Sequence, residues 1–467
     1  DKQKAEQQKR RTEKLSIPLE LMYLFVLLVT IVVVFVIYKR PIYEAMFVGY
    51  VTMIAVLGQY DSFGKFLIKP ATNTLFYAIV AFLSLAFIFG ETNVVDSIIN
   101  FVLALVGRFR GGAGYVSLVS STFMAALSGT GPGNVAATGV FTIPAMIKTK
   151  FPRELAATVE MSASSLGPMI PPSGTILLAF GVLEAIYPGK YQMSSFWMAV
   201  WGIGLWFILQ RFLTLYVFCR VYKVDPMAKE DIPDLGETIR EGWKALLVPL
   251  LIFVPLYLDF KFGSTFFTAR LGKDGAKAFS SSVILFTPGV AAFYSILISR
   301  NRIEGGLSLS NLFNIFKKGI RQVTPVAATV YFAYCISNLF GDAKVGAALG
   351  DYVQTFNMTR MQLAIFIPVF TTFLGMILPG SSQIAIFGVG IVSAMAAVGF
   401  NPFIVAAMLP AITGALEGMT PPLALSMYAA MGIADSGMAE TSKLAYVWVF
   451  AHLLFAVLIL AGLLPVL

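Results

Sequence analysis

The sequence has little histidine, cysteine or charge. Of its 467 residues, one is histidine, two are cysteine and 13% are charged, whereas about a quarter of the residues in an ordinary soluble domain are charged. Cys219 and Cys335 each lie inside an apolar stretch, so the chain offers no disulfide framework. Because His452 is the only histidine, a Cys/His metal site is not available either. The absence of a nucleophile–base constellation or a nucleotide-binding loop in the sequence argues against an enzyme.

In place of charge, the chain is rich in long apolar stretches. Hydrophobic residues make up 57% of it, and long apolar stretches recur from 17–38 to 446–467; about 20 residues are enough to cross a bilayer. This composition predicts an all-α polytopic protein embedded in the lipid bilayer. The net charge is +9, but Lys and Arg gather between the apolar stretches. They are therefore interpreted as topology signals, and no nucleic-acid partner is expected.

Four apolar runs are interrupted by Gly, Pro, Ser or Thr, where a lipid-exposed helix needs an unbroken backbone. Two of the runs are predicted to be re-entrant helical hairpins, at 112–147 and 360–397. Each is followed by a run that is split in its middle, which predicts discontinuous helices at 153–182 and 403–432.

The interruptions recur along the chain. An offset of 250 residues places Pro171 on Pro421 and Pro172 on Pro422, which indicates an internal repeat. The base of the first hairpin is rich in basic residues, whereas the second has only Arg360, so the two repeats are predicted to be inverted, with the first opening to the cytoplasm. Counted back from the first hairpin, the segment before Ile17 should lie outside the cytoplasm, yet it is rich in basic residues. The side of the N-terminus therefore stays open. The basic residues of the first hairpin base are Arg108, Arg110, Lys148, Lys150 and Arg153.

These features divide the chain into scaffold helices and a transport domain that contains the two hairpins and the two broken helices. Residues 1–16 are expected to be a polar tail, and 223–243 an amphipathic helix on the inner surface. The remaining divisions are 17–110 for scaffold helices and the first arm, 111–221 for the first half of the transport domain, 222–357 for the amphipathic linker, scaffold helices and the second arm, and 358–467 for the second half of the transport domain.

Paired broken helices in inverted repeats are typical of a transporter site at the bilayer midplane. A break leaves N–H groups unpaired at one new helix end and carbonyls at the other, and these ends attract anions and cations respectively. The alternative is a kink or a close helix contact, but four breaks in register favour a site. The predicted substrate contacts are polar residues of the hairpin tips and the first break: Thr130, Asn134, Ser164, Ser165, Ser173, Ser381 and Ser382.

Two carboxylates stand in apolar context, where an ionisable group is functional by default. Glu160 is expected either to be functional or to pair with a basic residue, and Glu417 is the stronger candidate because it lies in the second break. His452 has apolar neighbours in the sequence and is interpreted as a packing residue.

The motifs around the breaks resemble those of the large membrane subunit, or permease, of TRAP (tripartite ATP-independent periplasmic) transporters, in the ion-transporter superfamily. The resemblance rests on Ser128-Gly129-Thr130-Gly131, on Gly167-Pro168-Met169-Ile170-Pro171-Pro172-Ser173 and on Thr420-Pro421-Pro422, and it covers nearly the whole chain.

This resemblance implies an elevator carrier in the bacterial cytoplasmic (inner) membrane that takes up a small organic anion, a carboxylate, with a sodium gradient. It also implies two partners, a small membrane subunit and a periplasmic substrate-binding protein. The resemblance places one sodium ion among Ser128, Gly131, Gly167, Ile170 and Pro171, and a second among Gly380, Glu417 and Thr420.

The sequence departs from the family pattern at two positions. Pro379 replaces an Asp that many members carry before the Gly of the second hairpin tip, which puts sialic-acid-like or classical dicarboxylate substrates in doubt. Glu417 replaces a residue that is usually small, and a carboxylate there can strengthen a cation site or carry a proton. The alternatives are a stand-alone ion-coupled carrier of the same superfamily and, further off, a membrane enzyme or a channel.

Overall fold

The computed structural model describes residues 19–466 except 93, 129, 130, 172, 302, 304, 305, 346, 347, 349, 350, 353 and 354. Over this part of the chain every regular element is a helix. Six of the described helices are long and apolar enough to cross a membrane, or up to eight if each of two bent pairs is one span. The predicted all-α membrane fold is confirmed.

The first of the predicted scaffold regions begins with four long or apolar helices and a short one. Asn73 caps the longest of them, since its side chain accepts the N–H of Leu75 at 2.9 Å and thereby satisfies one of the unpaired donors at the helix start. The helices are α2 (Leu19–Val32), α3 (Ile42–Val56), α4 (Phe63–Ile68), α5 (Thr74–Gly90) and α6 (Val94–Val106).

The second scaffold region begins with an amphipathic helix that is shorter than predicted. Only Leu235–Leu246 is a continuous helix, α12, and not the whole of 223–243. Pro226 and Pro233 restrict the preceding backbone, and Asp234 starts the helix by accepting the N–H of Glu237. The helices that follow are α13 (Val248–Phe262), α14 (Thr268–Ile298) and α15 (Leu309–Asp342).

The four interruptions predicted from the sequence are ends of helices in the structure. Two long apolar helices, α11 (Met193–Val221) and α22 (Met438–Leu460), follow the broken segments. The first hairpin and discontinuous helix comprise α7 (Gly112–Ser128), α8 (Gly131–Lys148), α9 (Arg153–Ser164), η4 (Gly167–Met169) and α10 (Gly174–Ile186). Their counterparts are α17 (Arg360–Gly375), α18 (Gly380–Ala397), α19 (Pro402–Ile412), α20 (Gly414–Glu417) and α21 (Leu425–Ala434).

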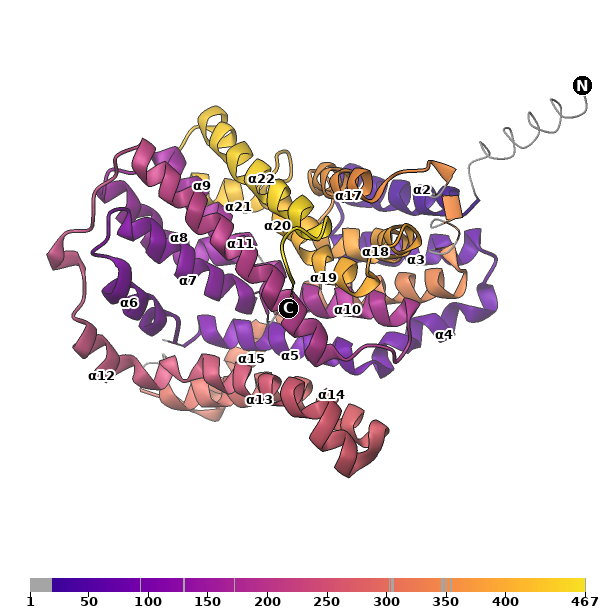
Figure 1. Cartoon of the computed structure of the whole chain (residues 1–467). Coiled ribbons are helices and arrows are strands. Elements are labelled where there is room, and N and C mark those ends of the chain that lie inside the picture. Colours follow the sequence, from indigo (N-terminus) through magenta and orange to yellow (C-terminus); the bar gives the residue numbers. More distant parts are fainter. Residues whose placement is uncertain are drawn as a thin grey trace, which may run out of the picture.

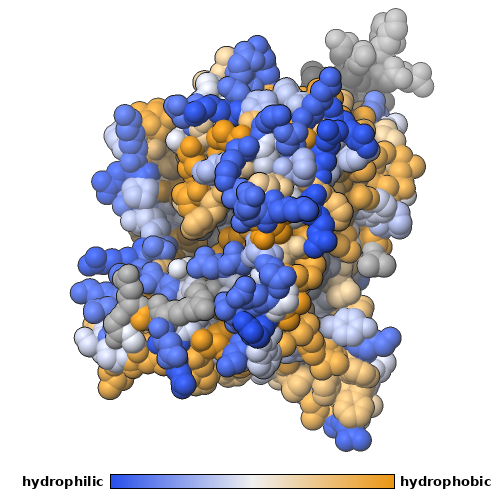
Figure 2. Space-filling model, turned by 90° about the vertical axis from the view of Figure 1, so that its left-hand side faces the viewer, coloured by the Kyte–Doolittle hydropathy of each residue, from blue (hydrophilic) through white to orange (hydrophobic). Residues whose placement is uncertain are grey.

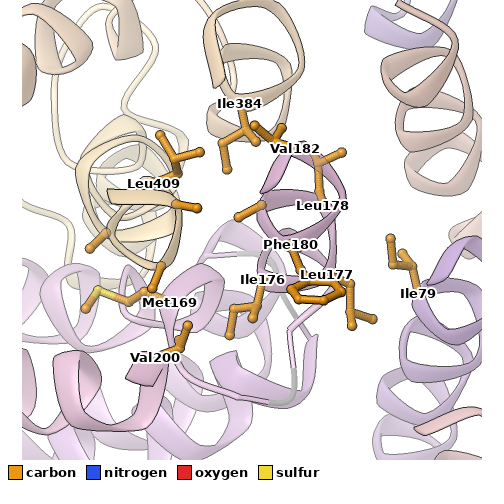
Figure 3. Packing of buried hydrophobic residues seen from close by; sticks show 14 of the residues in the cluster. Ile79, Met169, Ile176, Leu177, Leu178, Phe180, Val182, Val200, Ile384 and Leu409 are labelled. Atoms are coloured by element: carbon orange, nitrogen blue, oxygen red, sulfur yellow. The ribbon is translucent and has the colours of Figure 1, made fainter. Parts of the chain in front are cut away.

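The two halves exchange the second parts of their discontinuous helices. Helix α10 packs on α18 and α19, and α21 packs on α8 and α9 (Figure 1). Figure 3 shows the first of these contacts, where Ile384 of α18 lies beside Val182 of α10 and Leu409 belongs to the neighbouring α19. The packing is reciprocal under the offset of 250 residues. The predicted inversion of the repeats and the division into domains stay predictions.

One end of the molecule is polar and its flanks are apolar. Figure 2 looks at the end that carries α12 and the base of the first hairpin, and hydrophilic side chains gather there above and between hydrophobic ones. Lys148 forms an ion pair of 2.7 Å with Asp231, and Lys150 one of 2.8 Å with Asp225. These pairs fix the hairpin base to the segment before α12.

Candidate functional site

The second hairpin tip lies against the second break. The backbone N–H of Gly380, the first residue of α18, donates to the Glu417 carboxylate at the end of α20. A carboxylate is stabilised there by the positive end of the helix dipole and by the unpaired N–H groups of the first turn. Two of the three residues that the resemblance places at the second sodium site, Gly380 and Glu417, are therefore in contact.

The approach of the backbones at this tip leaves no room for a side chain. A Cβ atom at Gly380 would lie 2.9 Å from the Thr413 carbonyl carbon and closer still to the Gly414 backbone. A Cβ atom at Gly414 would in turn lie 2.8 Å from the Pro168 Cβ. The second break thus touches both the hairpin tip of its own half and the break of the other half.

The first hairpin tip reaches the second half through one serine. A Cβ atom at Gly131, which begins α8, would overlap the hydroxyl of Ser426 and would lie 3.7 Å from the Ser164 carbonyl oxygen. A Cβ atom at Gly418 would lie 2.6 Å from the same hydroxyl. Ser426 is fully buried, and its hydroxyl has no hydrogen-bond partner in the described structure. A buried orphan hydroxyl between two breaks is a candidate ligand atom.

Sequence reasoning missed Ser426. It lies four residues after Pro422, beyond the motif that marks the break, and the offset of 250 residues pairs it with Ile176, so the repeat gave no signal for it. The only sequence signal is a polar residue in the first turn of an otherwise apolar helix.

The first break brings together three of the predicted substrate residues. The Asn134 side-chain amide donates to the Ser164 hydroxyl at 2.7 Å. The hydroxyl of Ser165, the next residue, donates to the Ser162 carbonyl at 2.7 Å and lies 3.4 Å from the sulfur of Met419. All three predicted residues are buried, and Met419 belongs to the second break, so this contact also joins the halves.

A buried arginine supports the first break from behind. Arg211, in the middle of α11, is completely buried and donates to the Ser162 carbonyl at 3.2 Å and to the Ser165 hydroxyl at 3.3 Å. Its other partners are the side chain of Gln210, Nδ1 of His452, at 3.0 Å, and the sulfur of Met419, at 3.9 Å. The guanidinium group therefore places a positive charge at the carbonyl end of α9, where the helix dipole favours a cation.

His452 completes this group. Its Nε2 lies 2.9 Å from the Ala411 carbonyl and so carries the proton, while Nδ1 accepts from Arg211. The ring stacks on Phe207, with ring centroids 4.2 Å apart. This is the packing role expected for His452, but its hydrogen bond with Arg211 was not predicted. A charged residue in the middle of an apolar span was the available signal.

Other predicted residues have local partners. Ser173 caps α10 by accepting the N–H of Thr175, and the Thr420 hydroxyl donates to the Leu416 carbonyl at 3.0 Å. Ile170 and Pro171 line an apolar pocket of about 200 Å³ beside Phe123 and Trp201.

The remaining predicted residues lie at the hairpin tips and the first break. Ser382 is buried and its hydroxyl has no partner in the described structure, whereas Ser381 is half-buried. Gly167 is buried and begins η4. Ser128 ends α7, but its side chain lies outside the described residues, as does Thr130.

Among the described residues Glu160 has no basic ion-pair partner, although such pairing was one of its two expected roles. Its carboxylate accepts hydrogen bonds from serine and threonine hydroxyls, among them Ser117 at 2.7 Å and Thr142 at 2.6 Å. These donors belong to the two helices of the first hairpin.

The chemistry available at the breaks is that of oxygen ligands. Backbone carbonyls, serine hydroxyls and one carboxylate converge there, and the described residues contain no group of three or more His, Cys, Asp or Glu that would suit a transition metal. Hard oxygen donors suit alkali and alkaline-earth cations. The orphan hydroxyl of Ser426 fits a small cation between the breaks, so the donor set is consistent with the sodium ions implied by the resemblance.

Comparison with known proteins places this geometry in a family. Residues 21–467 match the family described as "Tripartite ATP-independent periplasmic transporter, DctM component". A C4-dicarboxylate TRAP transporter large permease protein of Rhodobacter capsulatus is 23% identical over 377 residues, which are 79% of this chain and 80% of that protein. A sialic acid TRAP transporter large permease protein of Vibrio cholerae is 21% identical over 78% of each chain.

Solved structures of similar fold are also transporters. The Alcanivorax borkumensis YdaH transporter has a TM-score of 0.58 at 16% identity and covers 85% of this chain and 86% of its own. Neisseria gonorrhoeae MtrF, described as an antimetabolite efflux pump, has a TM-score of 0.62 at 13% identity and covers 86% of this chain and 84% of its own. At these identities the likeness concerns the fold alone.

Proposed function

The chain belongs to the DctM component family of tripartite ATP-independent periplasmic transporters, and from this membership we propose that it takes up a small organic anion in symport with sodium. It is a multi-pass protein of the bacterial inner membrane and a transporter permease, not an enzyme. Its relatives are permeases for C4-dicarboxylates and sialic acid.

One observation supports the proposal most strongly, namely that both hairpin tips and both breaks meet in one buried region. Gly131, Gly418 and Ser426 join the first tip to the second break, and Gly414 touches Pro168 of the first break. A solute held there is in contact with both halves at once. Movement of the two halves together against the scaffold helices, as in an elevator, carries such a site across the membrane without opening a pore.

The sodium ions belong at the carbonyl and hydroxyl groups of the two breaks. Ser128, Gly131, Gly167, Ile170 and Pro171 supply the first set and Gly380, Glu417 and Thr420 the second. To the first set we add Ser426, because its buried hydroxyl has no other partner in the described structure. Bound sodium offsets the carbonyl dipoles that converge at the breaks and attracts the substrate anion.

The geometry also narrows the substrate class. Glu417 occupies the N-terminal end of α18, where a substrate carboxylate would otherwise bind, and like charges at that end repel. The N-terminal end of α8 at Gly131 has no such carboxylate bound to it among the described contacts. We therefore propose solutes with one carboxylate, oriented by Asn134 and the serines of the tips, in preference to dicarboxylates.

The test is uptake into proteoliposomes. The chain is reconstituted with its small membrane subunit and supplied with its periplasmic binding protein, and a panel of radiolabelled mono- and dicarboxylates is offered with and without an inward sodium gradient. We expect saturable uptake of a monocarboxylate that needs sodium. Uptake that does not depend on sodium overturns the sodium coupling. Preferred uptake of succinate, a dicarboxylate, overturns the proposed preference for monocarboxylates.

A second assay concerns the partners. Co-purification of the chain with a small membrane subunit is the expected result. Full uptake by the purified chain alone, without the small subunit or the binding protein, would indicate a stand-alone carrier instead.

A further inference from the structure

A second buried carboxylate lies apart from both breaks. Glu160 is in α9, and none of its surface is exposed. Its carboxylate points into the space between the two helices of the first hairpin, where Gly139 makes room for it, since a Cβ atom at Gly139 would lie 3.2 Å from the Glu160 Cγ. Nothing in the proposed function uses this group.

Five hydroxyl groups from three helices surround the Glu160 carboxylate. Two belong to α7, two to α8 and one to α9 itself. Oε2 accepts from Ser117 at 2.7 Å and from Thr142 at 2.6 Å. Oε1 accepts from Ser121 at 2.7 Å, Thr138 at 2.7 Å and Ser164 at 3.1 Å.

The described structure gives this carboxylate no ion-pair partner, and the buried Arg211 at the end of α9 donates to Ser162 and Ser165 instead. None of the described ion pairs includes Glu160. A buried carboxylate without a counter-charge is strongly destabilising, and hydroxyl dipoles compensate for it only in part. Each hydroxyl that donates to the carboxylate still has free lone pairs on its oxygen, so the same groups can coordinate a cation.

A further oxygen atom nearby has no partner. The Asn134 amide nitrogen donates to the Ser164 hydroxyl and to the Ser121 carbonyl, at 2.7 and 3.0 Å. Asn134 is only 1% exposed, so water does not reach its Oδ1 atom, and this atom has no hydrogen-bond partner in the described structure. An orphan acceptor beside a carboxylate and a ring of hydroxyls lacks a donor or a cation.

The second half of the chain has no such group. The offset of 250 residues pairs Glu160 with Pro410, Thr138 with Gly388 and Thr142 with Val392. Stable packing of a hairpin against a discontinuous helix therefore does not need these polar residues. Their presence in one half indicates a separate role.

We propose that Glu160, Ser117, Ser121, Thr138, Thr142 and Asn134 form a binding site for a small monovalent cation, sodium, inside the first half of the transport domain. The ligands are a carboxylate, hydroxyls and an amide oxygen, which suit a hard cation. The site is additional to the two sodium sites at the breaks. A sodium ion bound there ties both hairpin helices to α9 and holds the first tip closed on the break.

The site also shares hydrogen bonds with the predicted substrate contacts. Ser164 donates to Glu160, and Asn134 is a proposed ligand of the site; both are also predicted substrate contacts, and they are hydrogen-bonded to each other. Cation binding at Glu160 therefore orients the residues that face the substrate. The inference rests on the proposed sodium symport for its role in transport, but occupancy of the site is measurable without transport.

The experiment is equilibrium binding of radioactive sodium to the purified full chain in detergent, with choline as the replacement ion. Glu160→Gln keeps the size of the side chain and removes its charge. Thr142→Val keeps the shape and removes one hydroxyl. Thr158→Val is the matched control, since Thr158 is a buried threonine of the same helix whose hydroxyl bonds only to the Leu155 carbonyl.

We expect Glu160→Gln to bind one sodium ion fewer per chain than the unmodified protein, and Thr142→Val to bind sodium about tenfold more weakly. Thr158→Val should match the unmodified protein. An unchanged number of bound sodium ions in Glu160→Gln, or an unchanged sodium affinity in Thr142→Val, overturns the inference. The inference also fails if Glu160 binds and releases protons but no sodium. If Glu160→Gln does not fold, Thr142→Val decides. Sodium-independent uptake by the unmodified protein would defeat the proposed symport without affecting this count.

Discussion

Gly380 donates its backbone N–H to the Glu417 carboxylate, 37 residues further along the chain. The bond joins the tip of the second hairpin to the second break, and it places the carboxylate of Glu417 beside Pro379. The chain therefore has a carboxylate at the second tip, although the residue before Gly380 cannot supply one. Glu417 of the discontinuous helix supplies the carboxylate instead.

Neutralising this carboxylate should weaken cation binding at the second break. Glu417→Gln keeps an acceptor for Gly380 but removes the charge-assisted bond and the favourable interaction with the α18 dipole, together about 1 to 2 kcal/mol. We expect the sodium concentration for half-maximal uptake to rise about tenfold. Glu440→Gln, which disrupts an exposed ion pair with Lys443, is the control and should change nothing measurable. An unchanged sodium and pH dependence in Glu417→Gln contradicts a role for this carboxylate.

Adding one methyl group at the second tip should push this tip away from the second break. In Gly380→Ala the new Cβ atom meets the Gly414 backbone, which cannot rotate away as a side chain can. We expect loss of uptake and a destabilisation of about 1 to 3 kcal/mol, typical of overpacking. Gly432→Ala, a helical glycine with open space around it, should be neutral or slightly stabilising. Thermal unfolding in detergent and uptake assays measure both variants, and equal behaviour would show that the second tip does not contact the second break.

Removing the orphan hydroxyl of Ser426 should have opposite effects on stability and sodium binding. A buried hydroxyl without a partner is destabilising, so Ser426→Ala should leave the sodium-free protein equally stable or up to about 1 kcal/mol more stable. If the hydroxyl coordinates sodium, the same change lowers sodium affinity about tenfold. Ser337→Ala removes another buried orphan hydroxyl, in α15, and should leave sodium affinity unchanged. Equal sodium affinity in the two variants would remove Ser426 from the site.

Breaking the Arg211–His452 contact should destabilise the whole core. His452→Phe retains the stacking on Phe207 but leaves the Ala411 carbonyl and one guanidinium N–H without partners, at about 1 to 3 kcal/mol for each group. We expect a clear fall in melting temperature with sodium and without it. Arg220→Gln alters an exposed arginine of the same helix and should have little effect. A melting temperature of His452→Phe close to that of Arg220→Gln would mean that the histidine contributes no stability.

The sequence predicted the helix breaks well because Gly, Pro and Ser act on the local backbone. Gly380 begins α18 directly after Pro379, and η4 begins at Gly167, as the local chemistry requires. Propensity of this kind is independent of tertiary contacts. Most of the predicted sodium and substrate residues lie near these breaks for the same reason.

The contacts between elements were not predictable in the same way. The ring around Glu160 had a weak signal, since Ser117 and Ser121 are four residues apart, as are Thr138 and Thr142, and each pair lies on one helix face. Which face meets Glu160 depends on how the hairpin packs. Arg211 and His452 are 241 residues apart, and no local pattern connects them.

The inverted orientation of the two hairpin bases should appear in labelling from the two sides of the membrane. The native thiols of Cys219 and Cys335 are free but buried, so a membrane-impermeant maleimide should react only with an added cysteine. Lys148→Cys and Arg360→Cys place thiols at the exposed bases of the first and second hairpins. We expect Lys148→Cys to be labelled only in inverted membrane vesicles and Arg360→Cys only in intact cells with a permeable outer membrane. Labelling of both from the same side would require the two repeats to be parallel. An exchange between equivalent, oppositely oriented halves could then no longer turn one site from one side of the membrane to the other.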